Sequence, residues 1–113
     1  MIRVRYSPER LWLSVEGHAR SGPFGQDLVC AAVSALTLTL WENLRVLEAE
    51  DKLQQVCREL DSGSACLSCL PKQPFRREAE GVFRTVTRGL ACLARVYPRF
   101  LRCQRVTEAE ETP

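Results

Sequence analysis

Residues 28–41 form the longest apolar run of the chain, and this run limits the folds that the chain can adopt. Leu, Val, Ala and Trp fill it, interrupted only by one cysteine, one serine and two threonines. A membrane-spanning helix needs about 20 apolar residues, so the run is too short to cross a bilayer. It predicts a buried helix over residues 28–50, covered on more than one side by a second helix on the same sheet or by a partner subunit.

The residues before this helix alternate between apolar and polar side chains, as in a half-buried β-hairpin. A turn at residues 7–9 separates a first strand from a second that covers residues 10–17. Side chains two residues apart share one face of a strand. The residues expected to face the core are Ile2, Val4, Leu11, Leu13 and Val15.

The second half of the chain predicts three more strands and a second helix. Residues 53–60 and 64–70 predict two strands joined by the turn Asp-Ser-Gly at 61–63. An amphipathic helix is predicted over residues 75–97, before Pro98, and a last strand over 99–106. The sequence therefore predicts an α+β fold, β-β-α-β-β-α-β, with two helices packed on one face of a mainly antiparallel sheet. Residues 1–106 make a single domain, and residues 107–113 an acidic tail that we expect to be disordered.

Net charge and the first residues of the chain indicate which partners and which cellular compartment to expect. The 113 residues carry a net charge of +2, too little to predict nucleic acid as the main partner, so we expect none to be required. The first residues are strand-like and charged, unlike an apolar export signal. We therefore expect a cytoplasmic protein without a membrane span, whose six cysteines stay reduced.

A cysteine and the only histidine of the chain lie on either side of one short loop. His18 ends the predicted second strand, and Cys30 lies in the first turn of the predicted long helix. The N–H groups and dipole of a helix start lower a thiol pKa, and a nearby imidazole could take the thiol proton. The spacing thus allows a Cys-His dyad. For such a pair taken alone, the alternative is a buried structural cysteine and a surface histidine.

Residues 17–34 closely resemble the signature of the ribosomal-processing cysteine protease family, Prp. That signature is Gly-His-Ala followed at fixed spacing by Gly-x-Asp-(Ile/Leu)-Val-Cys-Ala-Ala-Val-Ser, and the chain carries all of it. The resemblance implies a cysteine endopeptidase with Cys30 as nucleophile and His18 as general base and then acid, without metal or cofactor. It also implies a homodimer that removes the N-terminal extension of a bacterial large-subunit ribosomal protein, cutting after an aromatic pair.

Three further positions of this segment have candidate roles. Asp27 suits the N-cap of the predicted helix and could also orient His18, although its charge would raise the thiol pKa. Gly22, Phe24 and Gly25 are expected to form a substrate loop, with Phe24 lining an apolar pocket. For the glycines, a simple turn is the alternative.

Two other functions stay open on the sequence alone. Cys66 and Cys69 have the spacing of redox and zinc sites, but no second cysteine pair supplies further ligands. Strand residues three apart also face opposite sides, so we interpret both cysteines as structural. The remaining alternative is a non-enzymatic ribosome-associated binding module that uses the arginine face of the second helix.

Overall fold

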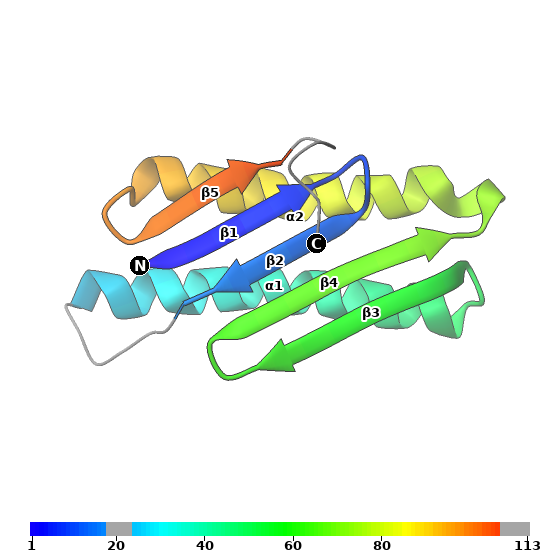
Figure 1. Cartoon of the computed structure of the whole chain (residues 1–113), viewed down its shortest axis with the longest axis horizontal. Helices are drawn as coiled ribbons and strands as arrows, with labels where there is room; N and C mark the ends of the chain where they lie inside the picture. Colours follow the sequence, from blue (N-terminus) through cyan, green and yellow to red (C-terminus); the bar gives the residue numbers. More distant parts are fainter. Residues whose placement is uncertain (18–23, 107–113) are drawn as a thin grey trace.

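The computed structural model describes residues 1–17 and 24–106, and for residues 24–27 it describes the backbone only. Within this part of the chain, two helices cover one face of a five-stranded sheet (Figure 1). The elements are β1 (Ile2–Ser7), β2 (Trp12–Glu16), α1 (Phe24–Ala49), β3 (Leu53–Asp61), β4 (Ser64–Pro71), α2 (Arg76–Val96) and β5 (Leu101–Arg105). A short 3-10 turn, η1 (Gln73–Phe75), precedes α2. The predicted fold class and element order are confirmed.

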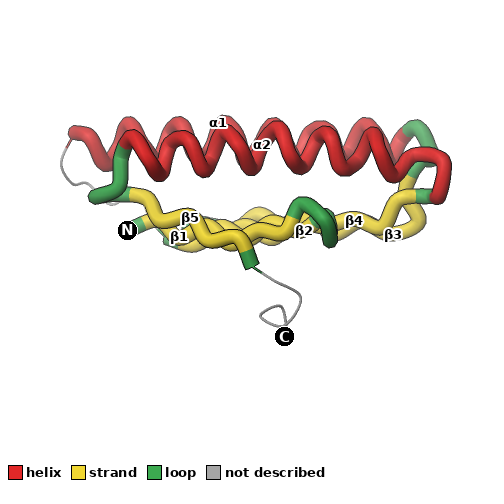
Figure 2. The backbone as a smooth tube through the Cα atoms, turned by 90° about the horizontal axis from the view of Figure 1, so that it is seen from above, coloured by secondary structure: helices red, strands yellow, loops and turns green. Residues whose placement is uncertain are grey.

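The sheet has the strand order β3-β4-β2-β1-β5. Its neighbours are antiparallel except for β1 and β5, which are parallel. Figure 2 shows both helices in one layer and the strands in another, so the described elements leave the opposite face of the sheet uncovered. In Figure 1, α2 lies behind β5 and β1, whereas α1 lies behind β2 and β4.

The core contains the hairpin residues that the period of two selects. Ile2, Val4, Leu11, Leu13 and Val15 are all buried. Leu11, however, precedes β2 and has a positive φ of 55°, an unusual conformation for a bulky residue. Its N–H donates to the Pro8 carbonyl, and its own carbonyl accepts the Cys69 N–H at 3.2 Å. These contacts and complete burial hold it there, so the second strand starts at Trp12 and not at residue 10 as predicted.

Helix α1 starts at Phe24, four residues earlier than predicted. The first N–H groups of a helix need no carbonyl partner within it, so Gly25 is tolerated in the first turn. Asp27 therefore lies inside the helix, and the prediction that it forms the N-cap is wrong. At the other end, Asp51 has a φ of 60°, and the Lys52 N–H donates to the Leu47 carbonyl at 3.0 Å. This is the Schellman arrangement that ends many helices.

The two helices pack closely where Gly89 of α2 faces α1. A Cβ added to Gly89 would lie 3.1 Å from Leu36 Cδ1, so a side chain there would press on Leu36. Helix α2 and the sheet thus cover α1 within one chain, although Leu28 and Leu38 remain 50% and 52% exposed. None of the described helices has the length and apolar character needed to cross a membrane.

A pair of glycine substitutions tests this helix contact. Gly81→Ala should raise the free energy of unfolding by about 1 kcal/mol, because alanine favours helix and nothing lies within 4 Å of its added Cβ. Gly89→Ala gains the same propensity but forces Leu36 to move, so its gain should be clearly smaller or reversed. Urea denaturation of the two variants measures the difference. Equal gains would contradict the close contact.

Candidate active site

A cleft of about 420 Å³ opens where the end of β2, helix α1 and the β3–β4 turn meet. Cys30, Ser34 and Leu38 of α1 lie along one side, and residues 60–65 of the hairpin lie along the other. The start of β1 and the end of β2 complete the lining through Ile2, Val15 and Gly17, and Val33 and Thr37 complete it from α1. The structure therefore places Cys30 in a cleft built from segments far apart in the sequence.

Gly17 holds the end of β2 against two other parts of this cleft. Its N–H donates to the Gly63 carbonyl in the β3–β4 turn at 2.9 Å. Its φ is +126°, and an added Cβ would lie 2.6 Å from the Met1 carbonyl oxygen and 2.9 Å from Ile2 Cα. Both the backbone conformation and the close approach require glycine. Gly17 lines the cleft, and His18 is bonded directly to it.

Cys30 lies one turn deeper in α1 than predicted. With Phe24 as the first residue, Cys30 is the seventh and belongs to the second turn. The helix dipole acts mainly on the first turn, so it acts less on Cys30 than the predicted position in that turn implied. The Cys30 residue is 8% exposed and lines the cleft.

The other predicted site residues divide into two groups. His18 and Gly22 lie outside the described residues. Phe24, Gly25 and Asp27 have helical backbone in the first turn of α1, so the prediction that Phe24 and Gly25 belong to a loop is wrong. The reason is that a helix can start in a glycine-containing segment whose first N–H groups need no partner.

The remaining cysteines have environments that suppress thiol reactivity or place them away from the cleft. Burial raises the pKa of Cys69 and of Cys103 to about 11. Burial, and then the Glu59 carboxylate, raise the pKa of Cys57. Cys66 and Cys69 occupy alternate sides of β4, because Leu67 and Cys69 face the core. Among the described residues, no group of three or more His, Cys, Asp or Glu could hold a metal.

Sequence reasoning missed the contribution of the β3–β4 hairpin to the site. Leu60, Asp61, Ser62 and Ser64 line the cleft opposite Cys30, although some 30 residues separate them from it in the chain. Leu60 is 40% exposed, and with Leu38 it forms an accessible apolar part of the lining. No local pattern in the sequence signals this meeting of α1 and the hairpin.

The fold and cleft define a class: a small two-layer α+β protein with a cysteine lining an open cleft. The same fold occurs in solved structures. A protein of Streptococcus mutans is 27% identical, with a TM-score of 0.72 and coverage of 96% of both chains. The ribosomal processing protease Prp of Staphylococcus aureus is 19% identical in complex with a substrate peptide, with a TM-score of 0.70 and coverage of 94% of this chain and 100% of that one.

Another structure of the Staphylococcus aureus protease carries a covalently linked product peptide. It is 18% identical to this chain, with a TM-score of 0.67 and coverage of 94% of this chain and 100% of that one. No curated protein sequence matches the chain.

A family model identifies the chain more directly than the solved structures do. The family model described as cysteine protease Prp matches residues 1–102. The chain belongs to this family, and it is a cysteine protease. The resemblance of residues 17–34 to the family signature thus extends over nearly all of the described fold.

The close approach at Gly17 gives a direct test of how the cleft is held. Gly17→Ala should lower the free energy of unfolding by about 1–3 kcal/mol, because alanine is strained at this φ and its Cβ overlaps the Met1 carbonyl. Gly81→Ala, in open space, is the matched control for the glycine-to-alanine change. Chemical denaturation measures both, and a Gly17→Ala protein as stable as the wild type would contradict the geometry.

Proposed function

We propose that this protein is an endopeptidase that removes the N-terminal extension of a bacterial large-subunit ribosomal protein in the cytoplasm. Cys30 is the nucleophile, and His18 is the general base and then the general acid. The observation that carries the proposal is that Cys30 and Gly17 line the same cleft. His18 follows Gly17 directly in the sequence, and this supports its proposed role as the base for Cys30.

The chemistry follows the usual course of a thiol protease. His18 takes the Cys30 proton, and the thiolate sulfur attacks the scissile carbonyl carbon. When the tetrahedral intermediate collapses, the C–N bond breaks, and the imidazolium gives its proton to the leaving amine. Water, deprotonated by His18, then attacks the thioester, which releases the new carboxylate and restores the thiol. No oxidant, metal or cofactor enters these steps.

The position of Cys30 in α1 supports a source of oxyanion stabilisation. Cα–Cβ bonds in a helix tilt toward its N-terminus, so Cys30 leans over the preceding turn, at residues 26 and 27. The N–H groups of residues 24–27 have no acceptor within the helix. We propose these groups as donors to the developing oxyanion, a role that backbone N–H groups have in other acyl-transfer enzymes. Asp27 is three residues before Cys30 in the sequence, and we keep for it the proposed role of orienting His18.

The apolar lining of the cleft supports an aromatic residue in the substrate. Leu38 and Leu60 line the cleft from opposite sides, and both remain about half exposed. Covering such side chains with a ring removes apolar surface from water. We therefore assign the aromatic subsite to Leu38 and Leu60. The roles proposed for Gly22, Phe24 and Gly25 near the substrate come only from the family resemblance.

Self-association is a second part of the proposal. Leu28, Ala31 and Ala35 form an exposed apolar stripe on α1. Such a stripe supports the homodimer that the family resemblance implies. Sedimentation of the protein over a range of concentrations tests it, and a monomer at all concentrations would exclude it.

Alkylation tests the nucleophile independently of any substrate. At about pH 6.5, below the usual cysteine pKa of about 8.5, iodoacetamide should modify Cys30 before the exposed Cys92, because the imidazole of His18 favours the thiolate. Accessibility alone predicts the opposite order, since Cys30 is only 8% exposed. Peptide mass spectrometry over time gives the rates. Cys69 and Cys103, with pKa values of about 11, should be the slowest.

The control for this labelling is His18→Ala. It should slow modification of Cys30 to the rate of Cys92 or below, while Cys92 itself is unaffected. Preferential labelling of Cys66 and Cys69 would favour a thiol redox protein and contradict the dyad.

Cleavage of two peptides tests the substrate proposal. A peptide with an aromatic pair followed by small residues should be cut after the pair, and its alanine-substituted version should be cut poorly. Leu60→Ala should lower kcat/KM for the aromatic peptide about tenfold, the effect of losing ~1.4 kcal/mol of apolar contact. Mass spectrometry locates the cut.

Three variants complete the experiment. Leu70→Ala removes a similarly exposed leucine from the same hairpin outside the cleft, so it should leave the rate unchanged. Cys30→Ala and His18→Ala should cleave neither peptide. Equal cleavage of both peptides by the wild type would indicate a general peptidase, and normal turnover by either dyad variant would rule out this mechanism.

A further inference from the structure

The uncovered face of the sheet carries an uneven distribution of charge. Ile2 and Val4 point to the core, so Arg3 points to the opposite, uncovered face. Arg102 is its register partner on the parallel neighbour β5 and is also exposed. Arg99 lies in the turn before β5, and that turn is tied to β1 because the Ile2 N–H donates to the Phe100 carbonyl at 2.9 Å. We call Arg3, Arg99 and Arg102 the arginine patch.

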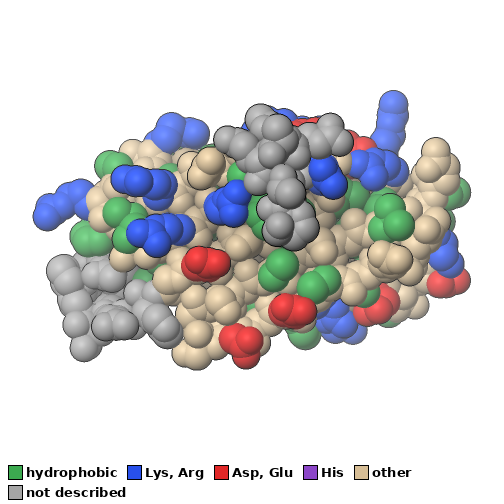
Figure 3. Space-filling model, viewed as in Figure 1, with side chains coloured by type: hydrophobic (Ala, Val, Ile, Leu, Met, Phe, Trp, Pro, Cys, Tyr) green, Lys and Arg blue, Asp and Glu red, His purple; other side chains and the backbone are tan. Residues whose placement is uncertain are grey.

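Figure 3 shows the resulting arrangement. Basic side chains gather over β5 and the start of β1, and acidic ones lie over the other half of the sheet. The acidic half includes Glu16, Glu59 and Asp61 on β2 and β3. The patch carries three positive charges, more than the net charge of +2 of the whole chain. The modest net charge therefore hides a local concentration of arginine.

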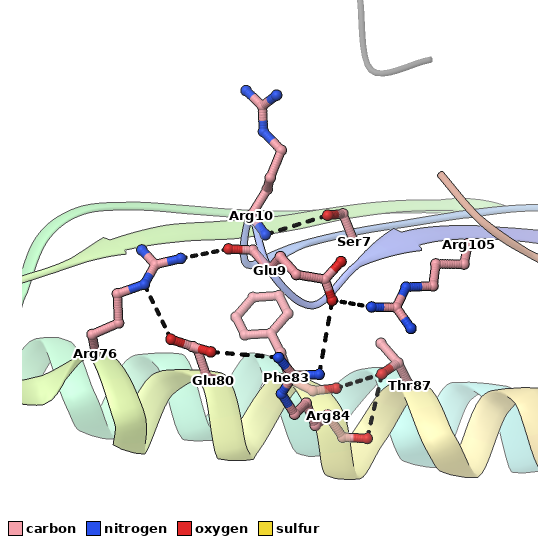
Figure 4. A network of polar contacts seen from close by, with 9 residues as sticks. All are labelled: Ser7, Glu9, Arg10, Arg76, Glu80, Phe83, Arg84, Thr87 and Arg105. Carbon is pink, nitrogen blue, oxygen red and sulfur yellow. Dashed lines mark hydrogen bonds and ion pairs between the residues drawn. The ribbon is translucent and has the colours of Figure 1, made fainter. Parts of the chain in front are cut away.

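Three other arginines of α2 and β5, Arg76, Arg84 and Arg105, have carboxylate partners. Figure 4 shows Glu9, in the β1–β2 turn, joined to Arg105 and Arg84, while Glu80 pairs with Arg76 at 3.1 Å and with Arg84 at 3.5 Å. In the part of the chain that the structure describes, no carboxylate lies within ion-pair distance of Arg3, Arg99 or Arg102. Glu16 is opposite Arg3 in the strand register but makes no such pair with it. Among the described residues, these three guanidinium groups thus form no ion pair with a carboxylate.

We propose that the arginine patch binds the phosphates of RNA, so that the protease engages its ribosomal-protein substrate on ribosomal RNA. The substrate part of this statement rests on the proposed function, whereas RNA binding does not. Guanidinium groups bind phosphate oxygens bidentately, and several of them near one another suit a chain of phosphates better than a single carboxylate. Strands lie about 4.8 Å apart, so Arg3 and Arg102 start from adjacent points on the sheet.

The location of the arginine patch supports RNA as the partner. Ile2 lines the cleft, and Arg3 is the next residue on the chain. Ile2 points to the core and Arg3 to the uncovered face, so an RNA strand on the patch would lie across the sheet from the cleft, at the same end of β1. A ribosomal protein bound to that RNA could then place its terminal extension beside Cys30. The free extension peptide needs no contact with the patch, so its cleavage should not depend on these arginines.

Fluorescence anisotropy with a fluorescein-labelled oligouridylate tests the proposal on the full-length protein. Binding should weaken with salt, with a slope of log K against log salt of about −2 for three phosphate contacts at about −0.7 each. Arg3→Gln/Arg102→Gln should reduce the slope to about −0.7 and retain the wild-type kcat/KM on the free peptide. Arg45→Gln/Arg77→Gln removes the same charge elsewhere and should keep nearly the wild-type slope.

The possible outcomes separate this inference from the proposed function. If the protein binds RNA but cleaves neither peptide, RNA binding by the arginine patch is supported and the proposed peptide substrate is wrong. Equal loss of RNA binding in both double variants would contradict RNA binding by the arginine patch. Binding to phosphatidylglycerol vesicles but not to RNA would contradict it as well. So would loss of free-peptide cleavage in Arg3→Gln/Arg102→Gln, because the arginines would then belong to the cleft.

Discussion

The contact of Gly17 with the backbone of Met1 and Ile2 is the constraint on which the cleft depends. Only a residue without Cβ fits there, since a Cβ would lie 2.6 Å from a carbonyl oxygen. The same residue hydrogen-bonds to Gly63, so one position joins the hairpin end, the start of β1 and the β3–β4 turn. Because these contacts are made by backbone, they fix where the chain enters residue 18 without occupying the cleft with a side chain.

Local environment gives one residue type several behaviours in this protein. Cysteines buried against the core, such as Cys69 and Cys103, have pKa values of about 11 and stay protonated at neutral pH. Cys30 lines an open cleft one helical turn from N–H groups that have no helix partner. Arginine follows the same logic, since Glu9 and Glu80 neutralise one group, while the arginine patch has no carboxylate partner among the described residues. Composition alone hides both differences.

Local patterns predicted most of the fold because they depend on near neighbours in the sequence. Alternation marked the buried face of the first hairpin, and the three-to-four repeat marked α2. The start of α1 was missed because the first turn of a helix makes few internal hydrogen bonds and so places weak demands on sequence. Leu11 was expected in a strand, but tertiary contacts hold it at a positive φ.

The sequence by itself determined the element order, the inward faces and the Cys-His motif that indicates the family, because each is encoded over short spans of chain. Only the tertiary structure decided that the β3–β4 turn forms the second wall of the cleft opposite Cys30, and that Leu38 and Leu60 meet there. It also decided which arginines are neutralised. Those features depend on strand order and helix packing, which bring together residues with no pattern in common along the chain.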